Sequence, residues 1–104
     1  YAAVSHLPHI LSYALMASVL NSDDAQQKLG HAGAGFRDFT RIAASSPEMW
    51  RDICLANKQA ILKELDQYLS ITQHLREMIA QGDGQSLEKV FQRASEARQR
   101  WEES

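Results

Sequence analysis

Residues 46–81 read SPEMWRDICLANKQAILKELDQYLSITQHLREMIAQ, and this stretch decides the fold. Ser46 followed by Pro47 is a good helix start, because serine caps free backbone amides and proline fits the first helical position. We predict one very long helix from residue 47 to about residue 81. At about 1.5 Å per residue it is roughly 50 Å long, so it should pack beyond its own domain. Its apolar residues recur in steps of three and four, the spacing of a helix–helix seam: Ile61, Leu65, Tyr68, Thr72, Leu75 and Ile79.

Helical patterns continue on both sides of this stretch. Gly82, Asp83 and Gly84 end the long helix, and Asp83 can cap a last helix that reaches about residue 102. In front, residues 1–20 form a first helix in which Pro8 bends the chain or marks the early turns. No segment alternates between apolar and polar residues in the manner of a strand, so the predicted fold class is all-α.

The first helix carries no charge, since residues 1–22 lack Asp, Glu, Lys and Arg. Its length could cross a bilayer, but its serines and histidines make it too polar for a membrane span. A secretory signal is also disfavoured, because no basic segment precedes the apolar residues. We expect a helix that is buried on most sides. A monomer of 104 residues has little interior, so this burial implies a partner chain or a neighbouring domain.

Composition sets the remaining limits. The length of 104 residues indicates a single domain over residues 1–104. Eleven basic and 13 acidic residues give a net charge of −2, which leaves no basic field for a nucleic acid. The lone Cys54 cannot form an intrachain disulfide, so the cytoplasm is the default location. Because the sequence begins within a helical pattern at Tyr1, we expect it to be one domain of a longer protein.

A short, glycine-containing segment connects the first helix to the long one. Residues 21–24, Asn-Ser-Asp-Asp, should cap a second helix that closes near Gly30. Residues 30–35, GHAGAG, should form a flexible loop in which Gly33 and Gly35 let the backbone approach a ligand. A short helix should follow over residues 36–44. The loop is not a phosphate loop, because it follows no strand and lacks the Gly-Lys-Ser/Thr ending.

Ser5, His6 and His9 lie on neighbouring parts of one helix face. Either both histidines are satisfied core residues, or they bind an anionic or hydroxylated small molecule to which imidazole can donate. A metal site is disfavoured, because zinc takes three or four ligands and His31 and His74 show no supporting spacing.

Two further patterns suit anion binding. Arg41 follows Asp38 by three residues and Arg37 by one turn. This spacing is typical of an exposed helix with local ion pairs, or of an arginine that clamps a carboxylate with Asp38 beside it. Trp50 falls in the first turn of the long helix, whose free amides attract anions. Trp50 is therefore either an ordinary packing residue or a residue that lines a pocket.

Three motifs together resemble the C-terminal helical domain of the prephenate dehydrogenase family, which includes arogenate dehydrogenases. The motifs are AVSHLPH at residues 3–9, GFRDFTRIA at 35–43 and MWRDI at 49–53, followed by Asn57 and Lys58. The resemblance covers nearly the whole chain. It implies a helical dimerisation domain with one very long helix in an intertwined homodimer. It also implies an intact enzyme that oxidatively decarboxylates prephenate or arogenate with NAD(P), in tyrosine biosynthesis.

The resemblance also implies roles for individual residues. Arg41 should hold the ring carboxylate of the substrate, His9 should lie near its side-chain carboxylate, and Trp50 should line that end of the pocket. Around these, Ser5 and His6 should line the site, and Asp38, Gly33 and Gly35 should support its mouth. The family's nucleotide-binding domain and catalytic histidine lie upstream of such a segment, so this chain alone should bind no cofactor and be inactive. The alternative is a helical dimerisation or interaction module without a ligand.

Overall fold

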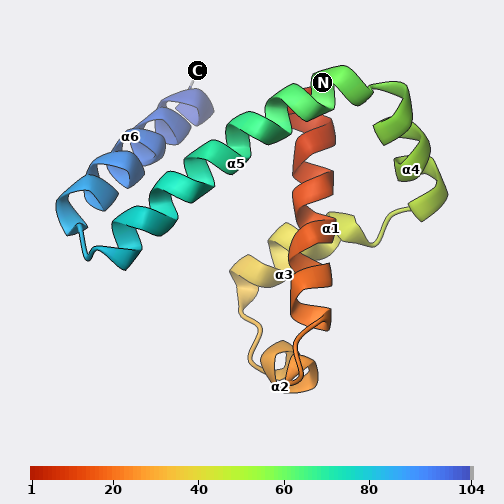
Figure 1. Cartoon of the computed structure of the whole chain (residues 1–104), viewed down its shortest axis with the longest axis horizontal. Helices are drawn as coiled ribbons and strands as arrows, with labels where there is room; N and C mark the ends of the chain where they lie inside the picture. Colours follow the sequence, from red (N-terminus) through yellow and green to blue (C-terminus); the bar gives the residue numbers. More distant parts are fainter. Residues whose placement is uncertain (104) are drawn as a thin grey trace. The chain divides into compact units, whose positions relative to one another are not determined.

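The computed structural model describes residues 1–103, with side chains for residues 1–102, and these residues form helices and turns without a strand (Figure 1). The all-α prediction is therefore confirmed. The chain divides into two compact units, Tyr1–Leu65 and the residues from Asp66 onward. In chain order the elements are η1 (Ala2–His6), α1 (Leu7–Leu20), α2 (Ala25–Gly30), α3 (Ala34–Thr40), η2 (Arg41–Ala43), α4 (Pro47–Ala56), α5 (Lys58–Ala80) and α6 (Gly84–Glu103).

A π-helical turn, η1, opens the first helix. The amides of Ser5 and His6 both donate to the Tyr1 carbonyl, at 2.9 Å each, so the second bond spans five residues. Pro8 follows in the first turn of α1. In a regular α-helix its ring would collide with the Val4 carbonyl, and a wider preceding turn relieves that clash. Pro8 therefore marks the early turns, as predicted.

The helix α1 forms the centre of the first unit, where it contacts α2, α3 and η2 (Figure 1). Two of its side chains donate to backbone carbonyls of the segment that crosses it. Ser12 Oγ donates to the Phe39 carbonyl at 2.9 Å, and Tyr13 Oη donates to the Ser45 carbonyl at 3.0 Å. Ser12 is completely buried, so these bonds fix the register between α1 and residues 39–45.

The single chain does not bury the first helix on most sides, so its expected burial by a partner chain or a neighbouring domain stays a prediction. Along α1 the buried residues are Leu7 and Ser12, while Val4 in the preceding turn is 83% exposed. The neighbouring α2 and α3 have six and seven residues and are too short to cover it. By length and hydropathy alone the helix Ala2–Leu20 could cross a membrane. Two of its polar side chains, Ser12 and Tyr13, bond to the segment of residues 39–45.

The connecting segment differs in detail from the prediction. The helix α2 ends at Gly30 as expected, but its first residue follows Asp24, whose side chain makes no cap bond and pairs with Lys28 at 3.4 Å. The helix α3 begins at Ala34, so the loop covers residues 31–33 rather than 30–35. Gly35 therefore lies inside a helix. The expected helix over residues 36–44 changes at Arg41 into the short 3₁₀ turn η2.

The prediction of one continuous helix over residues 47–81 is also wrong. Its start is confirmed, because Ser46 Oγ accepts from the Met49 amide at 3.3 Å and Pro47 takes the first helical position. The helix then ends at Ala56, and Asn57 leaves the helical conformation with φ −113° and ψ 36°. The second part, α5, has 23 residues and is about 35 Å long. Neither glycine nor proline stands at the break. The break is made by the polar residue Asn57, whose side-chain contact is described below.

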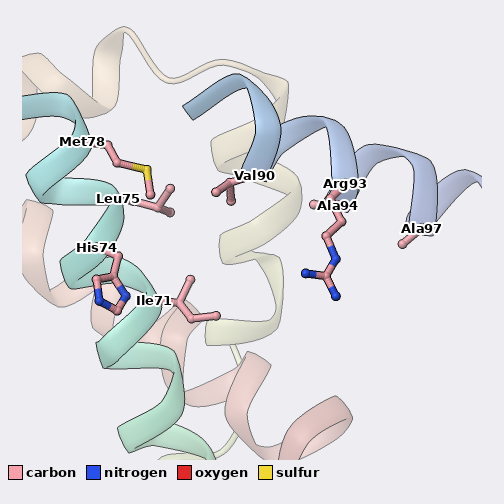
Figure 2. A pocket seen from close by; sticks show the side chains of 8 residues that line it. All are labelled: Ile71, His74, Leu75, Met78, Val90, Arg93, Ala94 and Ala97. Carbon is pink, nitrogen blue, oxygen red and sulfur yellow. The ribbon is translucent and has the colours of Figure 1, made fainter. Parts of the chain in front are cut away.

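In the second unit a tight turn joins α5 to α6. Gly82 has φ 65°, a conformation that favours glycine. Asp83 caps α6 as predicted: its carboxylate accepts from the Ser86 amide at 3.1 Å and from Ser86 Oγ at 2.7 Å. These two bonds, the hydroxyl first, lower the pKa of Asp83, with a smaller contribution from Lys89. Apolar side chains of α5 and α6 face one another across an open groove of about 510 Å³ (Figure 2).

Candidate functional site

The start of α4 places Trp50 against the first helix. The His9 ring stacks on the indole with a centroid distance of 3.9 Å and an interplanar angle of 16°. The His6 ring meets the same indole edge-on at 6.0 Å and 78°. Trp50 is only 8% exposed. Residues that are more than forty positions apart thus form one aromatic cluster, which brings together three of the predicted site residues.

Hydrogen bonds orient both imidazoles. His9 Nδ1 lies 3.0 Å from the Ser5 carbonyl. A carbonyl only accepts, so Nδ1 carries the proton, and Nε2 is the nitrogen left for another partner. Ser5 enters the cluster through this backbone group. His6 Nδ1 lies 3.1 Å from Asn57 Nδ2. The Tyr1 ring stacks on His6 at 6.5 Å.

The indole of Trp50 also holds a buried donor. Its Nε1–H has no hydrogen-bond acceptor among the described residues. A buried donor without an acceptor is costly, and in native proteins such groups are found where water or a ligand completes the pairing. One side of the indole borders a hollow of about 300 Å³, which is lined by Ile10, Tyr13, Pro47, Trp50, Arg51 and Cys54.

Arg41 lies elsewhere on the first unit. With Asp38 and Arg37 it lines a shallow hollow of about 570 Å³ against Met16 and Phe36. All three charged residues are exposed. The ion pairs of the described residues do not include one between Asp38 and Arg41. Trp50 does not line this hollow and Arg41 does not line the hollow beside Trp50, so in the single chain the two residues lie at separate hollows.

Neither Gly33 nor Gly35 is in close contact with another part of this chain. Gly33 precedes α3 in an extended conformation, φ −91° and ψ −177°, and Gly35 lies in its first turn. A Cβ at either position would meet no atom within 4 Å. Gly33 lines a small hollow with Lys28 and His31.

Neither a metal-binding cluster nor the strand–turn–helix unit of a dinucleotide fold is found among the described residues. They contain no group of three or more His, Cys, Asp or Glu side chains that could hold a metal ion. His31 and His74 are both exposed and lie on different elements. A dinucleotide fold needs a glycine-rich turn between a strand and a helix. Here the glycine segment follows the helix α2.

Sequence reasoning missed Asn57 as a member of the cluster. Its pairing with His6 spans 51 positions, and no periodicity reports a contact of that range. The available signal was an asparagine inside an otherwise unbroken helical pattern, since asparagine competes with helical hydrogen bonding and favours helix ends.

Comparison with known proteins gives a consistent result. The family described as "Prephenate dehydrogenase, dimerization domain" matches residues 1–93, which span both compact units. A prephenate dehydrogenase of Bacillus subtilis is 38% identical over 98 residues, which are 93% of this chain and 26% of that protein.

Solved structures agree with this match. The arogenate dehydrogenase of Synechocystis has a TM-score of 0.89 at 27% identity, over 96% of this chain and 37% of that chain. The prephenate dehydrogenase of A. aeolicus, in complex with hydroxyphenyl propionate and NAD+, has a TM-score of 0.86 at 33% identity, over 96% of this chain and 35% of that chain. This chain therefore spans about a quarter to two fifths of the proteins that it matches.

Proposed function

This chain belongs to the prephenate dehydrogenase family as its dimerization domain, and we propose that in a longer protein it supplies both the dimer contacts and part of the substrate site. The intact protein would convert prephenate, or arogenate, by oxidative decarboxylation, with a hydride passing to NAD+ or NADP+. Because the residues here do not fit a dinucleotide, we assign them only the binding and orientation of the substrate.

The observation that carries the substrate proposal is the stack of His9 on Trp50. A nine-tenths buried indole lies against an imidazole, and among the described residues neither its Nε1–H nor the imidazole Nε2 has a hydrogen-bond partner. Such a cluster offers a flat apolar wall together with polar groups. These suit one end of a cyclic, carboxylate-bearing ligand. Arg41 offers the complementary guanidinium for a second carboxylate.

For this function, Arg41 and Trp50 must both contact the same substrate molecule. Arg41 and Trp50 line different hollows of the single chain. We therefore propose that the two residues that act on one substrate come from different subunits of the dimer. A two-fold dimer would contain two such composite sites.

A mixed dimer tests this arrangement. One subunit of the full-length protein carries Arg41→Ala and the other carries Trp50→Ala. If the site is composite, one of the two sites in the mixed dimer is intact, and about half of the wild-type activity returns. If each chain builds its own site, both sites are defective and the mixed dimer stays as inactive as either parent.

Dimerisation is supported by the apolar surface that the single chain leaves open. In the second unit Ile71, Leu75 and Met78 face Val90, Ala94 and Ala97 across the groove between α5 and α6 (Figure 2). In the first unit α1 leaves Leu15 and Leu20 exposed. Contiguous apolar surfaces of this kind mark protein–protein contacts. We propose that a second copy covers them in an intertwined homodimer.

The direct test of function is turnover by the full-length protein. Purified protein is mixed with prephenate or arogenate and with NAD+ or NADP+, and the reduced nicotinamide is followed. Turnover of either substrate supports the proposal. Absence of turnover with all four combinations, together with no change in Trp50 fluorescence on adding hydroxyphenyl propionate, would favour the alternative of a dimerisation module without a ligand.

A further inference from the structure

Asn57 interrupts a sequence that otherwise reads as one helix. Its amide donates to the Ile53 carbonyl at 3.0 Å and its carbonyl accepts from the Ile61 amide at 3.1 Å, so it ends α4 and begins α5 at once. Its φ and ψ of −113° and 36° are not helical. The break turns the side chain toward the first helix, where Asn57 Nδ2 lies 3.1 Å from His6 Nδ1.

This contact defines a tautomer for His6. In a neutral imidazole one nitrogen donates and the other accepts. The Asn57 amide nitrogen is a donor only, so His6 Nδ1 accepts and the ring proton lies on Nε2. His9 is held in the opposite sense, because its Nδ1 donates to the Ser5 carbonyl. In their neutral forms the two imidazoles beside Trp50 thus present different groups: an Nε2–H donor on His6 and an Nε2 acceptor on His9.

Asn57 determines which ring nitrogen of His6 carries the proton, because the other neighbours described for His6 are aromatic rings. The other rings in contact with His6 are those of Tyr1 and Trp50, which lie over or beside it at centroid distances of 6.5 Å and 6.0 Å. The ion pairs of the described residues do not involve His6.

We propose that Asn57 is a positioning residue for the substrate site, which holds His6 edge-on to Trp50 as the Nε2–H tautomer and so fixes a hydrogen-bond donor in the aromatic cluster. The inference rests on the proposed function, in which this cluster receives one end of the substrate. Asn57 acts through His6 and touches no substrate itself.

The substitution Asn57→Asp separates this role from a purely structural one. Aspartate suits a helix terminus about as well as asparagine, so the helix break is retained. Its carboxylate only accepts, so it draws a proton onto His6 Nδ1. The matched control is Asn21→Asp, the same change at the exposed end of α1.

The readout is the ¹⁵N spectrum of the histidine side chains in the 104-residue chain. It is recorded near pH 8.5, where free histidine is neutral. We expect a bare Nδ1 and a protonated Nε2 on His6 in the wild type and in Asn21→Asp, and a protonated Nδ1 in Asn57→Asp. A protonated Nδ1 in the wild type, or a bare Nδ1 in a folded Asn57→Asp variant, overturns the proposal. The wild-type spectrum decides even if the variant fails to fold.

Kinetics of the full-length protein give the second readout. We expect Asn57→Asp to raise KM for the substrate about three- to tenfold, the range for one hydrogen bond, while Asn21→Asp leaves it unchanged. The spectroscopic test needs no substrate. If the proposed function is wrong, the full-length protein shows no turnover, while Asn57→Asp still changes the tautomer of His6. Failure of this inference shows as an unchanged tautomer in a protein that turns over.

Discussion

The bond from Ser12 to the Phe39 carbonyl supports a quantitative prediction about stability. Ser12 is completely buried, and its hydroxyl donates at 2.9 Å to the end of α3. The change Ser12→Ala removes the donor and leaves a carbonyl inside the unit without that partner, at a cost of about 1–3 kcal/mol. Alanine is the better helix former by up to about 0.5 kcal/mol, which offsets part of the loss. The expected net destabilisation is about 0.5–2.5 kcal/mol.

The matched control is Ser18→Ala, one and a half turns later on α1, where the side chain is exposed. The same propensity gain applies there, but no long-range bond is lost, so its stability should stay within about 0.5 kcal/mol of wild type. Both variants are unfolded in urea at one protein concentration, because dimerisation makes the apparent stability depend on concentration. Equal midpoints for Ser12→Ala and Ser18→Ala would show that the buried bond does not hold α1 to α3.

Three further predictions concern function, acid stability and assembly. In the full-length protein Arg41→Ala should weaken substrate binding about 10- to 100-fold, the range for a bond to a charged group, while the exposed Arg76→Ala changes nothing; an unchanged KM and kcat would remove Arg41 from the site. Asp83→Ala should shorten α6 at pH 7, as measured by circular dichroism. Because the folded pKa of Asp83 is lowered, its contribution is present above the ordinary value of about 3.9 and lost as the pH falls through the folded pKa. The difference between wild type and variant should therefore be full above the ordinary value and shrink as the pH falls below it, and a difference that does not change with pH would contradict the cap. Ile71→Glu should weaken the dimer in sedimentation experiments and Gln73→Glu should not; equal behaviour would place the interface elsewhere.

The sequence predicted those parts of the fold that depend on neighbouring residues. Ser46 with Pro47 and Asp83 with Ser86 are local caps, and both form as expected. Residues 21–24 were expected to cap α2 in the same way, but Asp24, which precedes its first residue, makes no cap bond and pairs with Lys28. The apolar spacing of residues 47–81 also predicted helix correctly on both sides of the break, but this spacing does not report the interruption, whose only local sign is Asn57 itself.

The candidate site was harder to predict from the sequence for the same reason. That His9 and Trp50 meet depends on how α4 returns to α1, and no spacing within either motif encodes that return. The resemblance to a family, rather than periodicity, grouped these two residues. Arg41 was grouped with them in the same way, yet one chain leaves it in a separate hollow. If the site is composite, as we propose, the pattern of one chain cannot show how its parts meet.

Two irregular backbone segments meet at the aromatic cluster, and their meeting explains why each is tolerated. The π turn of η1 carries His6, and the helix break at residue 57 carries the amide that bonds to it. A continuous helix through residue 57 would give up this bond, and a regular first turn would force Pro8 against the Val4 carbonyl. Irregular helical turns are frequent at functional sites, where they aim side chains that a regular helix would direct elsewhere. Here one irregularity places His6 beside the buried indole, and the other places the Asn57 amide against His6. This concentration of irregular backbone around Trp50, more than any single contact, makes the cluster a stronger candidate for ligand binding than for plain packing.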